Sequence, residues 1–406
     1  MAFSFSLDDV AYLRSAAGVE ALTAADALPL TESSLLRDLT AVRRTVGDHA
    51  APVVETVRLR RRAAARLGPD ASSWLFTDEA LQQAPPRPVA RHRAARLAGL
   101  GVHDLTCSIG ADLVALAGSN PVAVGSDLDQ VRLAMARHNL TASGLPARLL
   151  AADALTRTTR GLLGYADPAR RTSTGRRITS ADTVPSIADL DAAHPQRPPV
   201  LRVPPGIDYD ALARPGEVEI VSLDGVAREA VLWPAELASV ERRATVLSTG
   251  GPPEEISSAE PDDAGVGPVD AWLVDPDSAI VRAHLVRHWA ARHGMWLLDP
   301  HLAYLTGPDL PEHVRGFRVL DVAPFTERVV ATWLRRDRIG TLEILQRGTP
   351  VVPDELRGRL RSAMSKDTRT AATLVIARVG SGPVAYWCRA HPGRRSRRGR
   401  IGLDGR

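Results

Sequence analysis

One short stretch, residues 102–112 (VHDLTCSIGAD), constrains the fold of this chain more than any other. An apolar lead-in ends at Asp104, a turn of small residues follows, and apolar residues resume at 113–117. The pattern predicts a strand, a tight loop and the first turn of a helix. Such a loop lets a ligand approach the backbone closely, because the side chains at its centre are small: Thr106, Cys107, Ser108 and Gly110.

Acidic residues recur at the ends of the next expected strands. Residues 122–127 (VAVGSD) end at Asp127, about 20 residues beyond the loop, where a carboxylate can accept hydrogen bonds from both hydroxyls of a ribose. Asp153, in the segment AADA, offers a third carboxylate beside the expected position of an adenine. A single aspartate at a strand end is more often a helix cap or a solvated side chain, but this ordered recurrence favours an adenosyl ligand.

Strands and helices alternate from residue 99 onwards. We expect strands at 102–105, 122–126, 147–151, 163–166 and 199–203, and helices at 111–118, 128–139 and 186–193. This order predicts a parallel sheet with right-handed crossovers and helices on both faces. Because ligands of such sheets bind at the carboxyl ends of the strands, we expect Asp104, Asp127, Asp153 and Asp167 to converge on one edge.

The segments on either side follow other patterns. Apolar residues at helical spacing predict helices at 7–14, 33–44 and 53–67, with Asp9 and Thr31 as caps, and a short helix capped by Thr77. An Asp-Gly turn at 224–225 between two alternating segments predicts a hairpin. Residues 249–268, rich in Gly, Pro, Ser and acids, indicate a linker before a second, α+β domain.

Several segments, taken in order, resemble the motifs of class I S-adenosylmethionine-dependent methyltransferases: DLTCSIGAD (104–112), SDLDQVRLAMARHN (126–139), ADAL (152–155) and YADPARR (165–171). More narrowly, the chain is similar to a bacterial, largely actinobacterial, group in which this domain is followed by a THUMP-like domain. The resemblance covers about residues 70–388 and continues through FTDEALQQA, RVPPGI, EVEIVSLDG, VDPDSAIVRAHLV, AYLTG and LEILQRG.

The resemblance implies an α/β fold with a Rossmann-like, seven-stranded methyltransferase sheet. It implies an N-terminal helical region (1–98), the S-adenosylmethionine-binding domain (99–250), a linker (251–268), a THUMP-like α+β domain (269–390) and a disordered basic tail (391–406). The cofactor is expected to be S-adenosylmethionine, and RNA is the favoured substrate. The residues expected to bind the cofactor are Asp104, Thr106, Cys107, Ser108, Gly110, Asp112, Asp127, Asp153 and Ala154.

The segment YADPARR stands where methyltransferases of exocyclic amines carry an acidic or amide residue, two prolines and an aromatic. Asp167 is therefore expected to orient the acceptor, and Pro168 to fix the carbonyl before it. Arg170 replaces the aromatic and is the third expected catalytic residue, although it could instead bind a phosphate or a carboxylate.

Two further positions depart from the resembled group. Ser108 stands where the group commonly has glycine, and a positive φ there would cost on the order of 1 kcal/mol. Leu345 and Gln346 precede Arg347 where the group tends to have lysines, which removes two potential phosphate contacts.

Composition narrows the alternatives. The chain of 406 residues suits two or three domains, and its two cysteines exclude a disulfide framework. No apolar run reaches the roughly 18 residues of a membrane span, so the cytoplasm is expected. A helix is expected at 278–293, and no metal is expected because no carboxylate or cysteine pattern accompanies its histidines at 284, 288 and 293. A net charge of +4, with Lys366 as the single lysine, permits RNA binding. A non-catalytic RNA-binding protein that retains the fold and a small-molecule methyltransferase remain alternatives, and the oligomeric state stays open.

Overall fold

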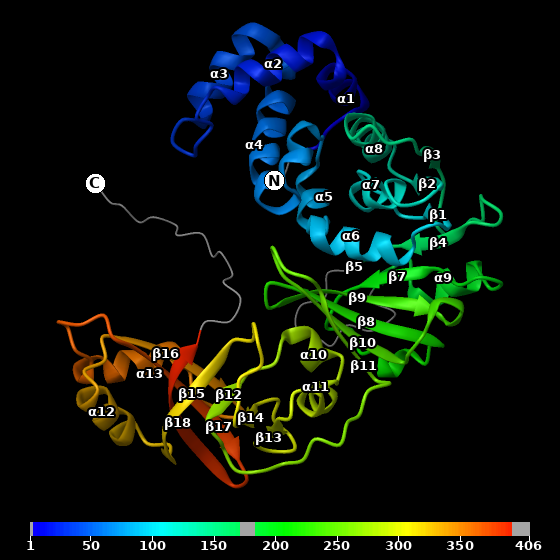
Figure 1. Cartoon of the computed structure of the whole chain (residues 1–406). Helices are drawn as coiled ribbons and strands as arrows, with labels where there is room; N and C mark the ends of the chain where they lie inside the picture. The colour runs from blue at the N-terminus through cyan, green and yellow to red at the C-terminus, as the bar shows by residue number, and fades with distance from the viewer. Residues whose placement is uncertain (1–2, 171–182, 392–406) are drawn as a thin grey trace. The chain divides into compact units, whose positions relative to one another are not determined.

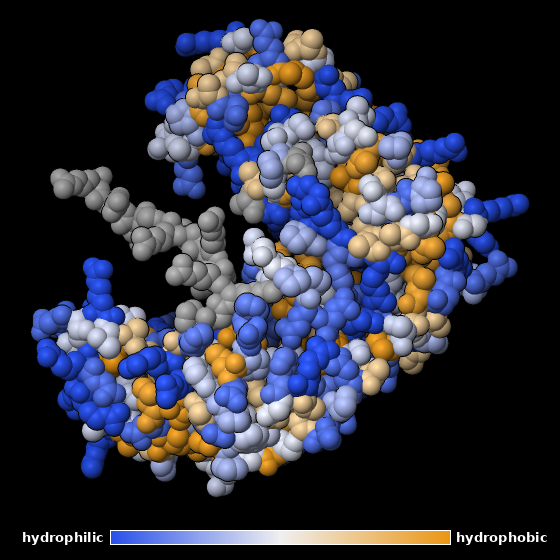
Figure 2. All heavy atoms as spheres, in the orientation of Figure 1, coloured by the Kyte–Doolittle hydropathy of each residue, from blue (hydrophilic) through white to orange (hydrophobic). Residues whose placement is uncertain are grey.

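The computed structural model describes residues 3–170 and 183–391 and divides into two compact units (Figure 1). The first unit consists of Met1–Val221 with Arg228–Ser239, and the second of Ser222–Ala227 with Val240–Arg406. On the face shown in Figure 2, hydrophilic residues cover much of the surface, and smaller apolar areas are scattered among them. Within the described ranges, every helix is too short or too polar to cross a bilayer.

The N-terminal region is helical, as predicted, with α1 (Leu7–Arg14), α2 (Ala16–Asp26), α3 (Leu35–Val46), α4 (Ala50–Leu67), α5 (Asp78–Gln83) and α6 (Arg87–Arg96). Thr77 caps α5 as expected. The other two caps differ, because Ser6 caps α1 with Asp9 as its capping-box partner, and α3 begins after Ser34 rather than Thr31. The apolar cluster of these helices includes Ile109 and Met135, so the expected boundary at residue 98 does not separate two cores.

The strands of the first unit have the order β8-β9-β7-β4-β1-β2-β3 within a nine-stranded sheet. These strands are β1 (Gly101–Asp104), β2 (Val122–Asp127), β3 (Arg148–Ala151), β4 (Leu163–Ala166), β7 (Val200–Val203), β8 (Gly216–Leu223) and β9 (Val226–Pro234). The pairs β1–β2, β2–β3, β1–β4 and β4–β7 are parallel, whereas β7 and β9 are antiparallel. The expected parallel sheet with alternating strands and helices is confirmed, and its helices are α7 (Ala111–Ala117), α8 (Gln130–Ala142) and α9 (Ile187–Ala193).

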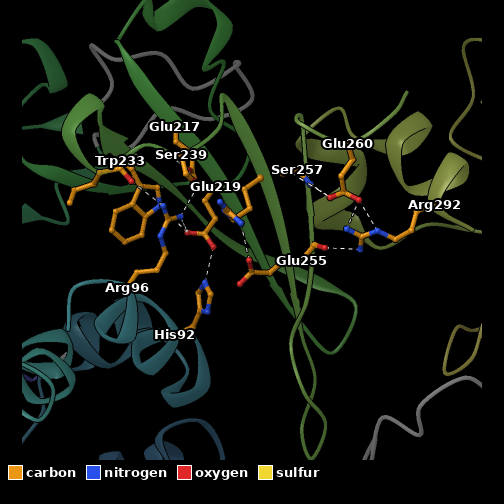
Figure 3. A network of polar contacts seen from close by, with 12 residues as sticks. His92, Arg96, Glu217, Glu219, Trp233, Ser239, Glu255, Ser257, Glu260 and Arg292 are labelled. Atoms are coloured by element: carbon orange, nitrogen blue, oxygen red, sulfur yellow. Dashed lines mark hydrogen bonds and ion pairs between the residues drawn. The ribbon is translucent and has the colours of Figure 1, made fainter. Parts of the chain in front are cut away.

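Helix α6 is attached to β8 by a buried polar network (Figure 3). Arg96 donates to Glu217 (2.6 Å) and Glu219 (2.9 Å), and its guanidinium lies 3.9 Å from the centre of the Trp233 ring. His92 and the Trp233 indole N–H reach Glu219 at 2.7 and 2.8 Å. Because both glutamates are almost fully buried, their charges depend on these partners, and the orientation of α6 is restricted accordingly.

The second unit contains a seven-stranded sheet of order β13-β14-β12-β15-β18-β17-β16. The strands are β12 (Trp272–Val274), β13 (Trp296–Leu297), β14 (Leu305–Gly307), β15 (Gly316–Pro324), β16 (Thr341–Arg347), β17 (Ala371–Val379) and β18 (Gly382–His391). Helices α12 (Glu327–Arg336) and α13 (Pro353–Leu360) share an apolar cluster with one face of β16–β18, including Trp333 and Trp387. This is the expected second α+β domain.

Two details of the second unit differ from the sequence prediction. The expected linker contains β11 (Glu254–Ser257), which pairs with β10 (Arg242–Leu247), and Ile256 is 1% exposed. One isoleucine among polar residues gave too weak a signal for a strand. The helix expected at 278–293 is divided into α10 (Ser278–Arg282) and α11 (Val286–Arg292), because His284 adopts φ 59° between them. Of the tail 391–406, His391 ends β18 and the rest lies outside the described residues.

Arg93, on α6, provides a test of the fold. Its guanidinium is 1% exposed and pairs with Asp112 and Glu229, so Arg93→Ala should remove one buried positive charge from two buried carboxylates and leave Arg202 as their remaining cationic partner. We expect the free energy of unfolding of the first unit to fall by about 3–5 kcal/mol, measured by urea denaturation with tryptophan fluorescence. The exposed Arg91 of the same helix is the control, and Arg91→Ala should change stability by less than about 0.5 kcal/mol. Equal losses in the two variants would contradict a structural role for the buried charge.

Candidate functional site

A cavity of about 460 Å³ lies at the carboxyl ends of β1, β2, β3 and β4. It is lined by the loop after β1, by residues that follow the other strand ends, by the segment before α6 and by β5 (Ala169–Arg170) and β6 (Thr183–Val184). Nine of the predicted site residues line it: Asp104, Thr106, Cys107, Ser108, Asp112, Asp127, Asp153, Ala154 and Asp167. The expected convergence of the four strand-end aspartates on one edge is therefore present in the structure.

The remaining predicted residues, Gly110, Pro168 and Arg170, are not among the described residues that line the cavity. Gly110 precedes α7 in the left-handed conformation (φ 81°), and an added Cβ would lie 3.3 Å from the Ala136 Cβ, so its place in the loop is set by backbone conformation and packing. Pro168 is buried and does not line the cavity. Arg170 lies in β5, with its side chain outside the described part of the structure, and Arg171 is outside the described residues.

Asp104 ends β1 and is 1% exposed. One of its carboxylate oxygens, Oδ1, accepts from the Thr106 amide at 3.2 Å, whereas Oδ2 has no hydrogen-bond partner among the described residues. Burial, with the neighbouring Asp112 carboxylate, raises the pKa of Asp104 well above its ordinary value. A buried carboxylate oxygen that lacks a donor beside a cavity favours a cationic or hydrogen-bond-donating ligand there.

The loop after β1 is tied to the end of β2. The Ser108 amide donates to Asp127 Oδ2 at 2.9 Å, and the Asp129 amide donates to Oδ1 at 2.9 Å. Ser108 adopts φ 49°, so the left-handed conformation considered from the sequence is confirmed. Each carboxylate oxygen of Asp127 keeps a second lone pair, so this side chain can still accept from two ligand hydroxyls.

Two exposed leucines follow the acidic residues of β2 and β3. Leu128 is 71% exposed and Leu155 is 40% exposed, and both line the cavity. Asp153 also lines the cavity, and its Oδ1 accepts from the Leu155 amide at 2.9 Å. Sequence analysis missed these leucines, although Leu128 directly follows Asp127 and Leu155 follows Asp153 after one alanine. Exposed apolar side chains in a cavity provide contact area for a flat apolar group.

Asp167 follows β4 and is held by Arg202 of β7, whose Nη1 donates to Asp167 Oδ2 at 2.5 Å. Arg202 also donates to Glu229 at 3.0 Å, and the Asp167 amide donates to the Thr106 hydroxyl at 2.8 Å. Burial raises the pKa of Asp167 to about 6, while the Arg202 charge acts in the opposite direction. Asp167 is thus mainly a carboxylate at neutral pH, in a fixed orientation.

Three residues of this charge network were missed by sequence analysis: Arg93, Arg202 and Glu229. Arg93 pairs with Asp112 and Glu229, and its guanidinium lies 5.1 Å from the centre of the Tyr165 ring. No local pattern could have identified them, because their partners are far apart in the chain; the residue numbers of Arg93 and Glu229 differ by 136.

Acidic residues outnumber basic residues in the cavity lining. Six aspartates and two arginines line it among the described residues, and both arginines are already paired, Arg202 as above and Arg132 with Glu79 at 2.6 Å. Within residues 3–170 and 183–391, no group of three or more His, Cys, Asp or Glu side chains could hold a metal ion. Cys107 and Cys388 are both free and buried. The site therefore suits an organic ligand that carries positive charge.

Comparisons with known proteins agree with this geometry. Two curated proteins, each named an uncharacterised S-adenosylmethionine-dependent methyltransferase, come from Mycobacterium tuberculosis strains CDC 1551 and H37Rv; each is 49% identical over 362 residues, which cover 86% of this chain and 99% of the relative. A crystal structure of a candidate methyltransferase from Porphyromonas gingivalis W83 matches with a TM-score of 0.72 and 20% identity, over 95% of this chain and 99% of that chain. Residues 314–390 match the THUMP domain-like family model, and residues 6–63 match a domain of unknown function.

The parallel sheet with an acid-lined cavity at its carboxyl edge defines a Rossmann-like α/β protein of the methyltransferase class. The chain belongs to the family of S-adenosylmethionine-dependent methyltransferases, and its cofactor is S-adenosylmethionine. The cavity fits that cofactor in two respects. Its volume is within the range of about 300–1,000 Å³ typical of small-molecule sites, and its acidic lining matches the cationic sulfonium and ammonium groups.

The strained conformation of Ser108 gives a prediction for the loop. Because glycine adopts φ 49° without steric cost, Ser108→Gly should raise the free energy of unfolding by about 1 kcal/mol, measured by chemical denaturation. Ser119 is exposed and does not have a positive φ, so Ser119→Gly is the matched control and should be neutral or slightly destabilising. If the two variants have the same stability, the loop stores no backbone strain at Ser108.

Proposed function

We propose that this methyltransferase acts on RNA and that the acid-lined cavity of its first unit holds S-adenosylmethionine. The observation that carries the cofactor placement is Asp104, whose buried Oδ2 has no hydrogen-bond partner among the described residues and lies beside the cavity. A bound ammonium would supply the missing donor, which is the arrangement that a buried carboxylate requires. Thr106, Cys107, Ser108 and Gly110 would form the adjoining loop, and Asp112 would add negative charge.

Asp127 and Asp153 would hold the adenosyl part of the cofactor. Asp127 retains acceptor capacity for the two ribose hydroxyls beyond its bonds to the Ser108 and Asp129 amides. Leu128 and Leu155 would contact the adenine faces, with Asp153 and Ala154 at its edge. The exposure of the two leucines supports this, because the contact would remove apolar surface from water.

Asp167 would orient the acceptor. S-adenosylmethionine carries its methyl group on a positively charged sulfonium, and the neutral thioether that leaves is already a good leaving group. The protein therefore needs to align the acceptor and exclude water. Asp167 can accept a hydrogen bond from an amine acceptor, because Arg202 fixes its orientation at 2.5 Å. Pro168 would restrict the backbone that follows, and Arg170 would lie near the entering substrate.

RNA as the substrate is supported by two features outside the cavity. The likeness of residues 314–390 to THUMP domains points to RNA. The net charge of +4 with 51 basic residues, of which Lys366 is the single lysine, favours binding to a phosphate backbone. A small-molecule substrate would need neither feature.

Cofactor placement can be tested at Asp127. Asp127→Asn keeps one oxygen acceptor for the loop amides but reduces acceptor capacity toward the ribose, so affinity for S-adenosylmethionine and for its demethylated product should fall about tenfold or more in titration calorimetry. Glu20 is exposed on α2, and Glu20→Gln should bind as the wild type does. Unchanged cofactor affinity in Asp127→Asn would contradict the proposal that Asp127 binds the ribose.

The substrate class can be tested by labelled methyl transfer. The full chain and methyl-labelled S-adenosylmethionine are incubated with RNA, protein and small-molecule fractions from a strain that lacks the gene. We expect the label in RNA for the wild type, and a loss of transfer of at least about 100-fold in Asp167→Asn with cofactor affinity retained. Label only in the small-molecule fraction would contradict action on RNA, and cofactor binding without transfer to any fraction would indicate a non-catalytic protein.

A further inference from the structure

Three neighbouring strands of the second unit present a continuous row of large side chains on one face (strands labelled in Figure 1). Trp272 of β12 lies directly opposite Arg318 of β15, and Arg318 lies directly opposite Arg389 of β18. Directly opposed residues of antiparallel strands point to the same face, with strands about 4.8 Å apart. The row is therefore set by strand register, and we call Trp272, Arg318, Arg389 and His391 the sheet-end face.

The two arginines of this face have no acidic partner. Both are exposed, and neither side chain makes a hydrogen bond or ion pair with any other residue that the structure describes. The positive charge of Arg389 contributes to lowering the pKa of Asp337. The Asp337 carboxylate is nevertheless already bound by Arg336 and by the Trp387 indole. Two like charges directly opposite each other oppose sheet formation, so this pair gives the fold no evident benefit.

Several arginines elsewhere in the second unit have acidic partners. Arg336 pairs with Asp321 at 2.8 Å, Arg347 with Asp275 at 2.6 Å, and Arg359 with Glu327 at 2.8 Å. These charges are largely balanced within the protein. The sheet-end face is thus a place where positive charge stays available for an external anion.

An aromatic surface adjoins the two arginines. The Trp272 ring is half-buried and meets the His391 ring edge to face, with centroids 5.8 Å apart. His391 lies opposite Gly316, which has no side chain to separate the two rings. A tryptophan that keeps part of its ring in solvent, beside two arginines, can stack against an unpaired base while the guanidiniums contact the flanking phosphates.

We propose that the sheet-end face binds single-stranded RNA, with an unpaired base on Trp272 and phosphates on Arg318 and Arg389. Single-stranded RNA fits better than an acidic protein, because it supplies flat bases together with regularly spaced anions. The inference rests on the proposed action on RNA and extends it, since it names the recognition surface and the unpaired state of the substrate. It assigns to the second unit the binding of RNA sequence that surrounds the methylated nucleotide.

The test measures binding of the full chain to a fluorescein-labelled single-stranded oligouridylate by fluorescence anisotropy at several salt concentrations. The double variant Arg318→Ala/Arg389→Ala should bind at least about tenfold more weakly at physiological salt. Its slope of log affinity against log salt should be less steep by about 1.4, because two phosphate contacts on a single strand are lost. Trp272→Ala should also bind about tenfold more weakly with an unchanged slope, because stacking involves no counterion release.

Arg378 provides the matched control. It is exposed on β17 at the hairpin end, opposite Pro383, and Arg378→Ala removes the same charge but should bind within about twofold of the wild type. The melting temperature of the double variant should not fall, because its substitutions remove a repulsion. A fall in melting temperature together with weaker binding would indicate a structural role and overturn the proposal.

Other outcomes separate this inference from the proposed function. Unchanged oligouridylate binding in the double variant, with binding intact in the wild type, would overturn the sheet-end face and leave action on RNA standing. No RNA binding by the wild type, with S-adenosylmethionine binding intact in calorimetry, would instead contradict action on RNA. Equal competition by polyglutamate would indicate an acidic protein as the partner, and preference for duplex RNA would exclude the stacking role of Trp272.

Discussion

The buried guanidinium of Arg93 is the interaction on which the methyltransferase unit depends. It joins three elements that are distant in the chain, because it pairs with Asp112 at the start of α7 and Glu229 on β9 and packs against Tyr165 of β4. A charge with 1% exposure is tolerated only while its partners remain in place, so the three elements cannot shift independently. The helix that carries Arg93 is itself restricted by Arg96 and its buried glutamates.

The pairing of buried carboxylates with arginines also explains why the cavity is suited to a cation. Where carboxylates face the interior, arginines neutralise them, as Arg93 does for Asp112 and Arg202 does for Asp167. Asp104, which also lines the cavity, has no such partner, and burial raises its pKa. The positively charged cofactor of this family would complete the charge balance that the protein leaves open, so fold stability and cofactor affinity rest on one electrostatic arrangement.

The second unit uses arginine differently. Arg336, Arg347 and Arg359 are paired with acids, whereas Arg318 and Arg389 are opposed to each other beside Trp272. In the first unit, paired charged side chains surround the cavity. In the second unit, Arg318 and Arg389 are exposed on one face of the sheet.

The sequence by itself determined the parallel α/β unit, the loop after β1 and the strand-end aspartates, because these follow from hydrophobic periodicity and residue size within short windows. It also indicated the strain at Ser108, which φ 49° confirms. Only the tertiary structure decided that Arg93, Arg202 and Glu229 surround Asp112 and Asp167, that residues 254–257 form a strand rather than a linker, and that Arg318 opposes Arg389. The physical reason is that strand register and buried ion pairs are set by packing between distant segments, and no local pattern records which charges will meet.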